Sequence, residues 1–398
     1  MKILLIDFYD VVGSAGGMEK VLCSMSNEFV NRGHQVFIVC CDKNLGLPFY
    51  DLNEDVKFMN LNGTGKDFDV KIFLKLEKEI IRFFRMLNKE RKEEFRLRFL
   101  YGKIIDNLKK VIVSYKPDII ITYDKNSIML VQQLMEIDIP VIAMVHGDVN
   151  NILNDKASNF LKEAYEKSIY VQVLIKNNQE IVKKYCPKTK AVWIPNCVET
   201  TLEKDYNHKK KIVTVGRLNK EEKRQHLLIE SFKKITDEIP PEWSVEIIGG
   251  TNNAGEENYK KCMQDYVERE CLTNKISFTG PVKNVNQHLF HADIFAFPSS
   301  TEGFGLALTE AMAVGLPAIG YRSCSSVNEL IIDGYNGFLC DDGIDDFAEK
   351  LKILIDDAEL RKKMGQNARK LMKKYDPEKI WNQWEALINK VVSNYKEN

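Results

Sequence analysis

The chain has 398 residues, which is more than one hydrophobic core usually serves, so we expect two domains of roughly 200 residues each. Its 57 basic and 57 acidic residues leave no net charge, and we expect no nucleic-acid partner. The nine cysteines form no CxxC pair, which indicates reduced, buried thiols. No signal peptide precedes the first predicted strand, and no apolar run approaches about 18 residues, so we expect a cytoplasmic protein.

Short apolar runs alternate with segments of helical period through the first half of the chain. The predicted strands are 3–8, 35–41, 56–61, 118–123, 141–146, 170–175 and 191–194. Strand-like runs separated by helices are typical of a parallel, doubly wound sheet. The pattern therefore predicts a Rossmann-like domain over residues 1–196.

The polar, aperiodic residues 197–210 hold no apolar run long enough for a strand and are interpreted as an interdomain linker. A second alternation follows, with predicted strands at 211–215, 244–248, 275–279, 293–297, 317–321 and 338–340. It predicts a second Rossmann-like domain over 211–376, followed by a terminal helix over 377–398. The expected fold class is thus α/β, with two doubly wound parallel sheets in series.

The link between the first strand and the first helix is rich in glycine, and doubly wound folds bind phosphates at this link. Gly16 and Gly17 let the backbone approach a ligand closely, because they carry no side chain. The link is not a dinucleotide fingerprint, since Ala15 replaces the second glycine and only Asp42 lies near the ribose position. A loop that needs positive φ is the alternative interpretation.

His146 directly follows the predicted strand 141–145, at the carboxyl edge of the first sheet. Ligands bind at this edge in open α/β folds, so the position favours a binding role. A structural histidine is the alternative interpretation. Asp124 and Asp148 are weaker candidates at the same edge, whereas His288 and His291 are interpreted as structural residues.

Two cations follow the first strand of the second domain. Gly216 and Arg217 come directly after strand 211–215, and Lys223 lies six residues beyond Arg217. Fixed cations suit a pyrophosphate group, because they stabilise the negative charge that develops on a leaving diphosphate. The residues between them, 220–222, are interpreted as a solvated charge run.

The stretch 297–317 runs from a buried-looking strand through a loop into a predicted helix at about 306–314. The loop and helix start contain Glu302, Gly303, Phe304, Gly305 and Leu306, with Glu310 further inside the helix. The two glycines remove side chains where a ligand approaches, and the first N–H groups of the helix offer an anion or hydroxyl site. We expect Glu302 and Glu310 to bind different parts of one extended ligand.

Taken in order, these motifs resemble those of the retaining glycosyltransferases of family 4, of the type that builds bacterial cell-surface polysaccharides. The matching features are a Gly-Gly loop, a histidine at a strand end, a GR(x)5K spacing and an EGFGL…E block. The resemblance covers essentially the whole chain and implies the GT-B fold, in which a terminal helix crosses back to the first domain. One departure is the run 323–326, SCSS, where many members carry a Gly-Gly pair.

The resemblance implies retaining transfer of a hexosyl group from a nucleotide sugar to a hydroxyl of a glycan or lipid-linked glycan, with no metal and no other cofactor. The nucleotide is expected to be UDP, with GDP left open. Glu302 would hold donor-sugar hydroxyls, and Glu310 would hold the ribose diol. The implied catalytic residues are His146, Arg217, Lys223 and Glu302, and the implied donor-binding residues are Gly16, Gly17, Gly216, Arg217, Lys223, Pro281, Val282, Glu302, Gly303, Phe304, Gly305, Leu306 and Glu310.

Two other classes share parts of this pattern. A nucleotide-sugar epimerase of the same fold should bring further acid–base carboxylates and histidines. A non-catalytic sugar-nucleotide-binding protein would not need Arg217, Lys223 and His146 together.

The segment 71–116 is strongly basic, with 14 lysines and arginines against 6 aspartates and glutamates. Apolar residues recur among these charges at helical spacing, and a basic amphipathic helix can lie on an anionic membrane. We therefore expect peripheral contact with the inner face of the cell membrane. The alternative is an apolar stripe that packs on the first domain.

Overall fold

The computed structural model describes residues 1–8, 11–62, 89–135, 137–199 and 210–397. It divides into two compact units. The first unit comprises Met1–Ser14, Met18–Ile194 and Asn382–Asn398, and the second unit comprises Ala15–Gly17 and Pro195–Trp381. The linker expected at 197–210 stays a prediction, because 200–209 lie outside the described residues.

The first unit is built on a seven-stranded parallel sheet of order β3-β2-β1-β4-β5-β6-β7. Its strands are β1 Lys2–Asp7, β2 Gln35–Cys40, β3 Lys57–Asn60, β4 Ile119–Thr122, β5 Val141–Val145, β6 Tyr170–Val173 and β7 Lys190–Trp193. The helices are α1 Gly17–Asn31, α3 Lys89–Tyr115, α4 Lys125–Met129, α5 Val149–Ile152, α6 Asn159–Glu166 and α7 Asn178–Tyr185, with a π-helical turn at Leu130–Leu134. Every residue of β4 and β5 is buried, which explains why these strands are continuous apolar runs rather than alternating ones.

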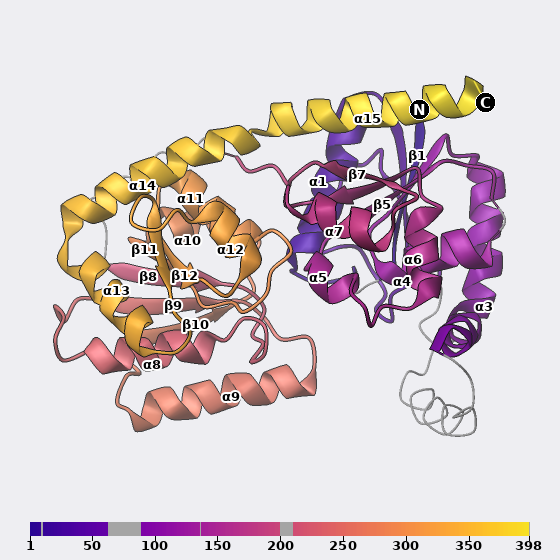
Figure 1. The fold of residues 1–398 in the computed structure, drawn as a ribbon. Coiled ribbons are helices and arrows are strands. Elements are labelled where there is room, and N and C mark those ends of the chain that lie inside the picture. Colours follow the sequence, from indigo (N-terminus) through magenta and orange to yellow (C-terminus); the bar gives the residue numbers. More distant parts are fainter. Residues whose placement is uncertain (9–10, 63–88, 136, 200–209, 398) are drawn as a thin grey trace. The chain divides into compact units, whose positions relative to one another are not determined.

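The second unit is built on a six-stranded parallel sheet of order β10-β9-β8-β11-β12-β13. Its strands are β8 Lys211–Val215, β9 Ser244–Ile248, β10 Ile276–Gly280, β11 Ile294–Phe297, β12 Ala318–Tyr321 and β13 Gly337–Cys340. The helices are α8 Gln225–Ile235, α9 Ala254–Arg269, α10 Val285–Phe290, α11 Leu306–Val314, α12 Ser325–Leu330, α13 Asp345–Asp356 and α14 Ala358–Met372. Helices cover both faces of this sheet, with α8 and α9 on one side and α11 and α12 on the other (Figure 1).

The expected α/β class is confirmed, since each half of the chain forms a doubly wound parallel sheet. The core of the second unit is built from strand residues such as Ile212 and Ile247 together with Leu228 of α8 and Met263 of α9. Apolar residues at helical spacing thus pack α8 and α9 onto the strands that they connect. This packing holds the loops at the carboxyl ends of the strands in place.

The last helix, α15 Pro377–Glu397, returns to the first unit, as expected. Arg32 donates a 2.7 Å hydrogen bond from Nη1 to Asn382 Oδ1, and Tyr395 donates one of 2.7 Å to Asp138. Trp384 of the same helix is buried. Among the described residues, no helix has both the length and the apolarity needed to cross a bilayer.

Candidate active site

The order of the second sheet reverses between β8 and β11. From β8 the sheet grows through β9 to β10 in one direction, and from β11 it grows through β12 to β13 in the other. The loops that follow β8 and β11 therefore leave the sheet in opposite directions and open a crevice, which is where doubly wound folds bind their ligands. Arg217 and Lys223 lie on the first loop, and Glu302 lies on the second.

The end of β8 packs directly against the end of β9. Gly216 donates a hydrogen bond to Ile248 O at 2.9 Å, and Leu218 donates one to Gly250 O at 2.9 Å. Gly249 has φ of +153°, and a Cβ at this position would lie 1.9 Å from Gly216 O. Only glycine fits there, so the two loops approach closely and Arg217 is held at the edge of the sheet.

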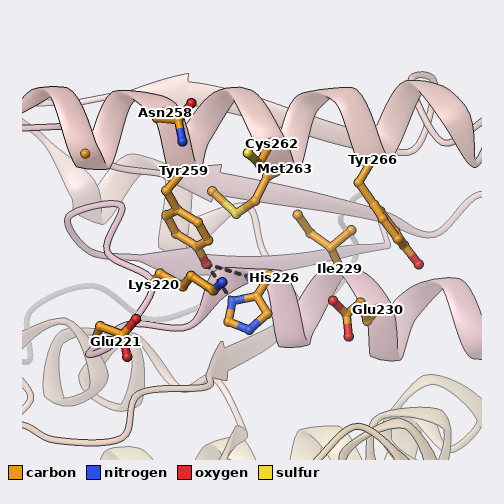
Figure 2. Close-up of a pocket in the computed structure, with 11 residues that line it drawn as sticks. Lys220, Glu221, His226, Ile229, Glu230, Asn258, Tyr259, Cys262, Met263 and Tyr266 are labelled. Carbon is orange, nitrogen blue, oxygen red and sulfur yellow. Dashed lines mark hydrogen bonds between the residues drawn. The ribbon is translucent and has the colours of Figure 1, made fainter.

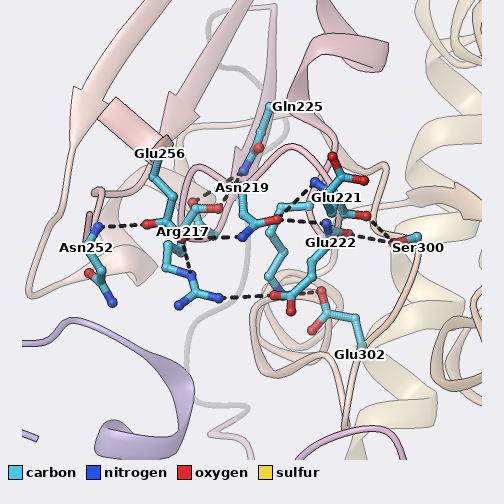
Figure 3. A network of polar contacts seen from close by, with 11 residues as sticks. Arg217, Asn219, Glu221, Glu222, Gln225, Asn252, Glu256, Ser300 and Glu302 are labelled. Carbon is cyan, nitrogen blue, oxygen red and sulfur yellow. Dashed lines mark hydrogen bonds and ion pairs between the residues drawn. The ribbon is translucent and has the colours of Figure 1, made fainter. Parts of the chain in front are cut away.

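Arg217 lies between two carboxylates, as Figure 3 shows. Its Nε atom is 3.3 Å from Glu256 Oε1, and its Nη2 atom is 3.1 Å from Glu222 Oε2. Glu256 comes from the first turn of α9, whereas Glu222 belongs to the same loop as the arginine. The guanidinium is thus fixed in a partly exposed position at the end of β8.

Lys223 forms an ion pair with Glu302, 79 residues further along the chain. The ammonium group also lies 5.9 Å from the centre of the Phe297 ring, and the Glu302 side chain is only 10% exposed. Such a pair is less screened by water than a pair on the open surface. The pair brings together two of the predicted catalytic residues across the crevice.

The loop that carries the cations has its own hydrogen bonds. Asn219 Oδ1 accepts from the backbone N–H groups of Glu221 and Glu222 at 3.0 and 2.8 Å, and its side-chain amide donates to Glu256 at 3.3 Å. Ser300, two residues before Glu302, donates its backbone N–H to Glu222 O at 2.8 Å. The Asn219 bonds thus hold the loop after β8, and the Ser300 bond connects it to the loop after β11.

The second loop leads into α11. Gly305 is the N-cap residue and has φ of +79°, a conformation that favours glycine. A Gly305 side chain would meet Phe297 and Leu308, so the chain turns tightly against the sheet before the helix begins. Among the residues that the structure describes, no side chain caps the N-terminus of α11, which is where a helix leaves backbone N–H groups unpaired.

The other predicted residues of this loop differ in what they can offer a ligand. Phe304 is buried, and its ring packs edge-on against Tyr375 at 5.4 Å, so only its main chain can reach a ligand. Glu310 is buried in the middle of α11. Gly303 and Leu306 are partly exposed on either side of Gly305.

Pro281, which precedes Val282, packs near Gly250, a residue hydrogen-bonded to the loop after β8. Pro281 follows Gly280, which has φ of +82° and ends β10. A Cβ on Gly250 would lie 3.5 Å from the Pro281 ring, and Gly250 is the residue bonded to Leu218. The main chain after β10 is therefore next to the loop that holds the two cations.

In the first unit, His146 follows β5 and stacks on Tyr123 with ring centroids 5.0 Å apart. Within the described residues, its buried Nε2 atom has no hydrogen-bond partner. Burial lowers the pKa of His146 to about 4, so the imidazole is neutral at pH 7. A neutral imidazole with an unsatisfied ring nitrogen can exchange a hydrogen bond with a ligand hydroxyl.

Gly16 and Gly17 lie at the start of α1, with Gly17 as the first residue of the helix and Gly16 directly before it. Asp42 does not face a ribose position, because its Oδ2 atom accepts hydrogen bonds from Val11 and Val12 N–H at 2.7 Å each. Asp124 and Asp148 are also structural, since their side chains accept hydrogen bonds at the N-termini of α4 and α5. His288 Nδ1 lies 2.9 Å from Glu246, in accordance with its structural interpretation.

Sequence reasoning missed Glu222, Glu256 and Asn219. It interpreted residues 220–222 as a solvated charge run, and no motif pointed to Glu256. The one available signal was the asparagine directly after Gly-Arg-Leu, because asparagine often bonds to the backbone two residues on. Ion pairs between distant segments leave no local pattern in a sequence.

A separate cavity of about 460 Å³ lies between α8 and α9 (Figure 2). Tyr259 lines the cavity, and its hydroxyl accepts from His226 N–H at 3.0 Å and lies 2.8 Å from Nδ1 of the His226 ring. Ile229 and Met263 line the cavity, and Lys220 and Glu221 border it. This cavity therefore shares the loop after β8 with the crevice but contains neither Arg217 nor Lys223 among its lining residues.

Comparison with known proteins relates this geometry to described families. A family model for "Glycosyltransferase Family 4" matches residues 15–202, and a model for "Glycosyl transferases group 1" matches residues 201–371. An uncharacterized glycosyltransferase from Methanocaldococcus jannaschii is 31% identical over 66% of this chain and 70% of its own length.

Two further proteins are similar over nearly their whole length. An alpha-1,4-N-acetyl-D-galactosaminyltransferase of Campylobacter jejuni, whose name gives a diNAcBac-PP-undecaprenol-linked GalNAc acceptor, is 23% identical over 97% of this chain and 98% of its own. A variant of TarM from S. aureus, solved with UDP and alpha-GlcNAc-glycerol, has a TM-score of 0.75 at 17% identity and covers 98% of this chain and 100% of its own. At that identity, the likeness shows the fold.

Proposed function

The chain belongs to the family 4 glycosyltransferases with the GT-B fold, and we propose that it transfers a hexosyl group, with retention, from a UDP-sugar to a hydroxyl of a glycan or lipid-linked glycan. The donor in this proposal is a UDP-hexose or a UDP-N-acetylhexosamine. The observation that carries the proposal is the meeting of Arg217, Lys223 and Glu302 at the reversal point of the second sheet.

The two cations have a chemical reason to lie there. Breaking the bond between the sugar and the diphosphate leaves additional negative charge on the terminal phosphate, and cations that are already in position stabilise this charge in the transition state. Arg217 can present a planar pair of N–H donors to phosphate oxygens, whereas Lys223 acts as a compact point charge. Because two fixed cations neutralise the leaving group, we propose that the transfer needs no metal ion.

In this proposal, the other residues of the second unit each bind a different part of the donor. Glu302 binds donor-sugar hydroxyls, and the buried Glu310 binds the ribose diol. The N–H groups at the start of α11 bind the diphosphate. Gly303 and Gly305 carry no side chain that would block its approach. Main-chain groups of Pro281 and Val282 bind the base, which we take to be uracil. UDP in the solved TarM complex supports this choice, and GDP is the alternative that the experiment tests.

Three further residues of the proposed site are uncharged. His146 offers the unsatisfied Nε2 atom to a sugar hydroxyl, and Gly16 and Gly17 allow a substrate to approach the backbone. A glycan or lipid-linked acceptor is supported by the acceptor in the name of the Campylobacter relative. In a retaining reaction without a protein nucleophile, a phosphate oxygen of the donor accepts the proton of the acceptor hydroxyl.

The experiment is product analysis with the purified chain. UDP-glucose, UDP-galactose and their N-acetylated forms are each mixed with GalNAc- or GlcNAc-terminated polyprenyl diphosphates, with and without EDTA, and the GDP-sugars form a parallel series. We expect an α-linked product from an α-linked UDP donor, with equal rates in EDTA. A β-linked product contradicts retention, loss of rate in EDTA contradicts metal independence, and turnover of GDP-sugars alone contradicts the choice of UDP.

The same mixtures separate the two other classes. An epimerase would change the donor sugar without an acceptor, which NMR of the nucleotide sugar detects. A non-catalytic binding protein would bind the donor and release no nucleotide with any acceptor. Either result would replace the transferase proposal.

We also propose peripheral contact with anionic membrane through 71–116, of which 71–88 lie outside the described residues. On α3, Leu97, Ile104 and Leu108 are buried in the first unit, but Phe95 and Phe99 stack at 6.0 Å on an exposed face. Exposed aromatic rings among basic residues suit a membrane interface. We expect co-sedimentation with vesicles to rise with anionic lipid and fall with salt. Equal recovery in the supernatant at every lipid composition would show that the helix only packs on the unit.

A further inference from the structure

The two carboxylates on Arg217 differ in burial. The Glu256 side chain is 7% exposed, whereas that of Glu222 is 47% exposed. They also approach different atoms of the guanidinium, since Glu256 faces Nε and Glu222 faces Nη2. This contrast suggests two different roles for two acidic residues on one arginine.

Glu256 is held from several directions. Its Oε2 atom accepts a 2.7 Å hydrogen bond from Asn252 N–H, and its Oε1 atom accepts one of 3.3 Å from the Asn219 side chain. Its own backbone N–H donates to Asn253 Oδ1 at 3.0 Å, which caps α9. A carboxylate fixed at a capped helix start cannot follow a moving partner, so it determines where the Arg217 Nε edge lies.

Within the described part of the chain, the backbone of Glu222 is held on both sides, and its carboxylate contacts Arg217. Its N–H donates to Asn219 and its carbonyl accepts from Ser300, but its carboxylate extends over the loop surface to Nη2. The Nη atoms form the part of an arginine that matches two phosphate oxygens. Glu222 therefore places an anion of this chain where a diphosphate oxygen would bind (Figure 3).

We infer that Glu256 is a positioning residue for Arg217, and that Glu222 is a competing anion that the donor diphosphate displaces from Nη2. This inference rests on the proposed function, because it takes the diphosphate as the ligand of Arg217. Glu256 raises diphosphate affinity because it keeps Arg217 in position. Glu222 lowers diphosphate affinity because it already pairs with Nη2 of Arg217. The two substitutions must then act in opposite directions.

The experiment is titration calorimetry of the full chain with UDP, and with uridine as the probe that lacks phosphate. For Glu256→Gln we expect UDP affinity to fall about tenfold, and for Glu222→Gln we expect it to rise about threefold, with uridine affinity unchanged in both. Glu257→Gln and Glu221→Gln remove the same charge one residue away and should leave UDP affinity unchanged. In an Arg217→Ala background, neither Glu256→Gln nor Glu222→Gln should alter UDP affinity further.

The outcomes separate this inference from the proposed function. Suppose that the wild-type chain binds UDP. If both substitutions change UDP affinity in the same direction, or if their effects on affinity remain in the Arg217→Ala background, the inference is wrong and the proposed function stands. If the chain binds neither UDP nor GDP, the proposed function is wrong, and the series is repeated with inorganic pyrophosphate. Opposite effects on pyrophosphate would then support the inference alone, and no pyrophosphate binding would overturn both. Glu222 lies on the surface, so Glu222→Gln should fold. The direction in which it changes UDP affinity therefore tests the inference even if Glu256→Gln unfolds.

Discussion

The loops that follow β1 and β8 occupy equivalent places, since each leaves the first strand of a doubly wound sheet at the point where the strand order reverses. Their chemistry differs. In the first unit, the backbone N–H groups of Val11 and Val12 are bound by the Asp42 carboxylate. In the second unit, the loop carries Arg217 and Lys223, and its backbone is held by uncharged groups of Asn219 and Ser300.

The difference shows that topology sets the place of a site and side chains set its ligand. A buried carboxylate under the first loop repels a phosphate and uses the N–H groups that a phosphate would need. The second loop keeps two cations at the same kind of edge, so the charged part of a substrate belongs there.

The contrast between the two loops is tested most strongly by removing the cations of the second loop. We expect Arg217→Ala and Lys223→Ala each to lower kcat by roughly 10² or more, since each removes preorganised stabilisation of the leaving diphosphate. Lys220→Ala, which removes an exposed cation from the same loop, should change kcat by less than about threefold. Steady-state kinetics and thermal unfolding are measured together. Normal specific activity with a large loss of stability would mean that the two charges are structural.

A second test removes the anion beneath the first loop. Asp42→Asn weakens the charge-assisted hydrogen bonds to Val11 and Val12, and we expect a local loss of about 2 kcal/mol. Amide hydrogen exchange of peptides covering residues 11–17 should then become about thirtyfold faster. The exposed Asp55→Asn should leave exchange in this loop unchanged. Unchanged exchange in Asp42→Asn would show that the carboxylate does not hold the loop.

Glu302 and Glu310 test which part of the donor binds at each position of the crevice in the second unit. We expect Glu310→Ala to weaken UDP binding about tenfold, because it removes the partner of the ribose diol. Glu302→Ala should mainly lower kcat, with UDP affinity within about threefold of wild type, because the donor sugar is absent from UDP. Calorimetry with UDP and steady-state kinetics provide the two readouts. Wild-type UDP binding by both variants would remove Glu310 from the nucleotide site.

The last prediction concerns the pH dependence of stability through His146, the neutral group of the first unit. Burial lowers the pKa of His146 from 6.5 to about 4, so the unfolded chain binds a proton at a higher pH than the folded chain. The neutral imidazole contributes stability that is present above pH 6.5 and is lost as the pH falls towards 4. Against His146→Gln, wild type should lose up to about 1.4 kcal/mol per pH unit in this window. Denaturant titrations at several pH values measure it, and parallel curves for the two proteins would contradict the prediction.

Much of the fold could be predicted because its signals are local. The strands β1, β4 and β5 are short apolar runs, and the helices between them repeat apolar residues at helical spacing, so each segment carries its own evidence. The residues at strand ends could be predicted as well, because parallel strands place their carboxyl ends at one edge of a sheet. Arg217 and Glu302 lie on adjoining strand ends for this reason.

The sequence by itself determined the two doubly wound sheets, the order of the motifs and the residues at the sheet edges. Only the tertiary structure decided that Glu256 and Glu222 approach different atoms of Arg217, that Asp42 holds the first loop, and that Phe304 packs on Tyr375. Hydrophobic periodicity is written into neighbouring residues, so a sequence displays it. A pair such as Arg217 and Glu256 forms only after folding brings distant segments to the same edge, and a charged residue looks the same in sequence whether it meets water, a ligand or another charge.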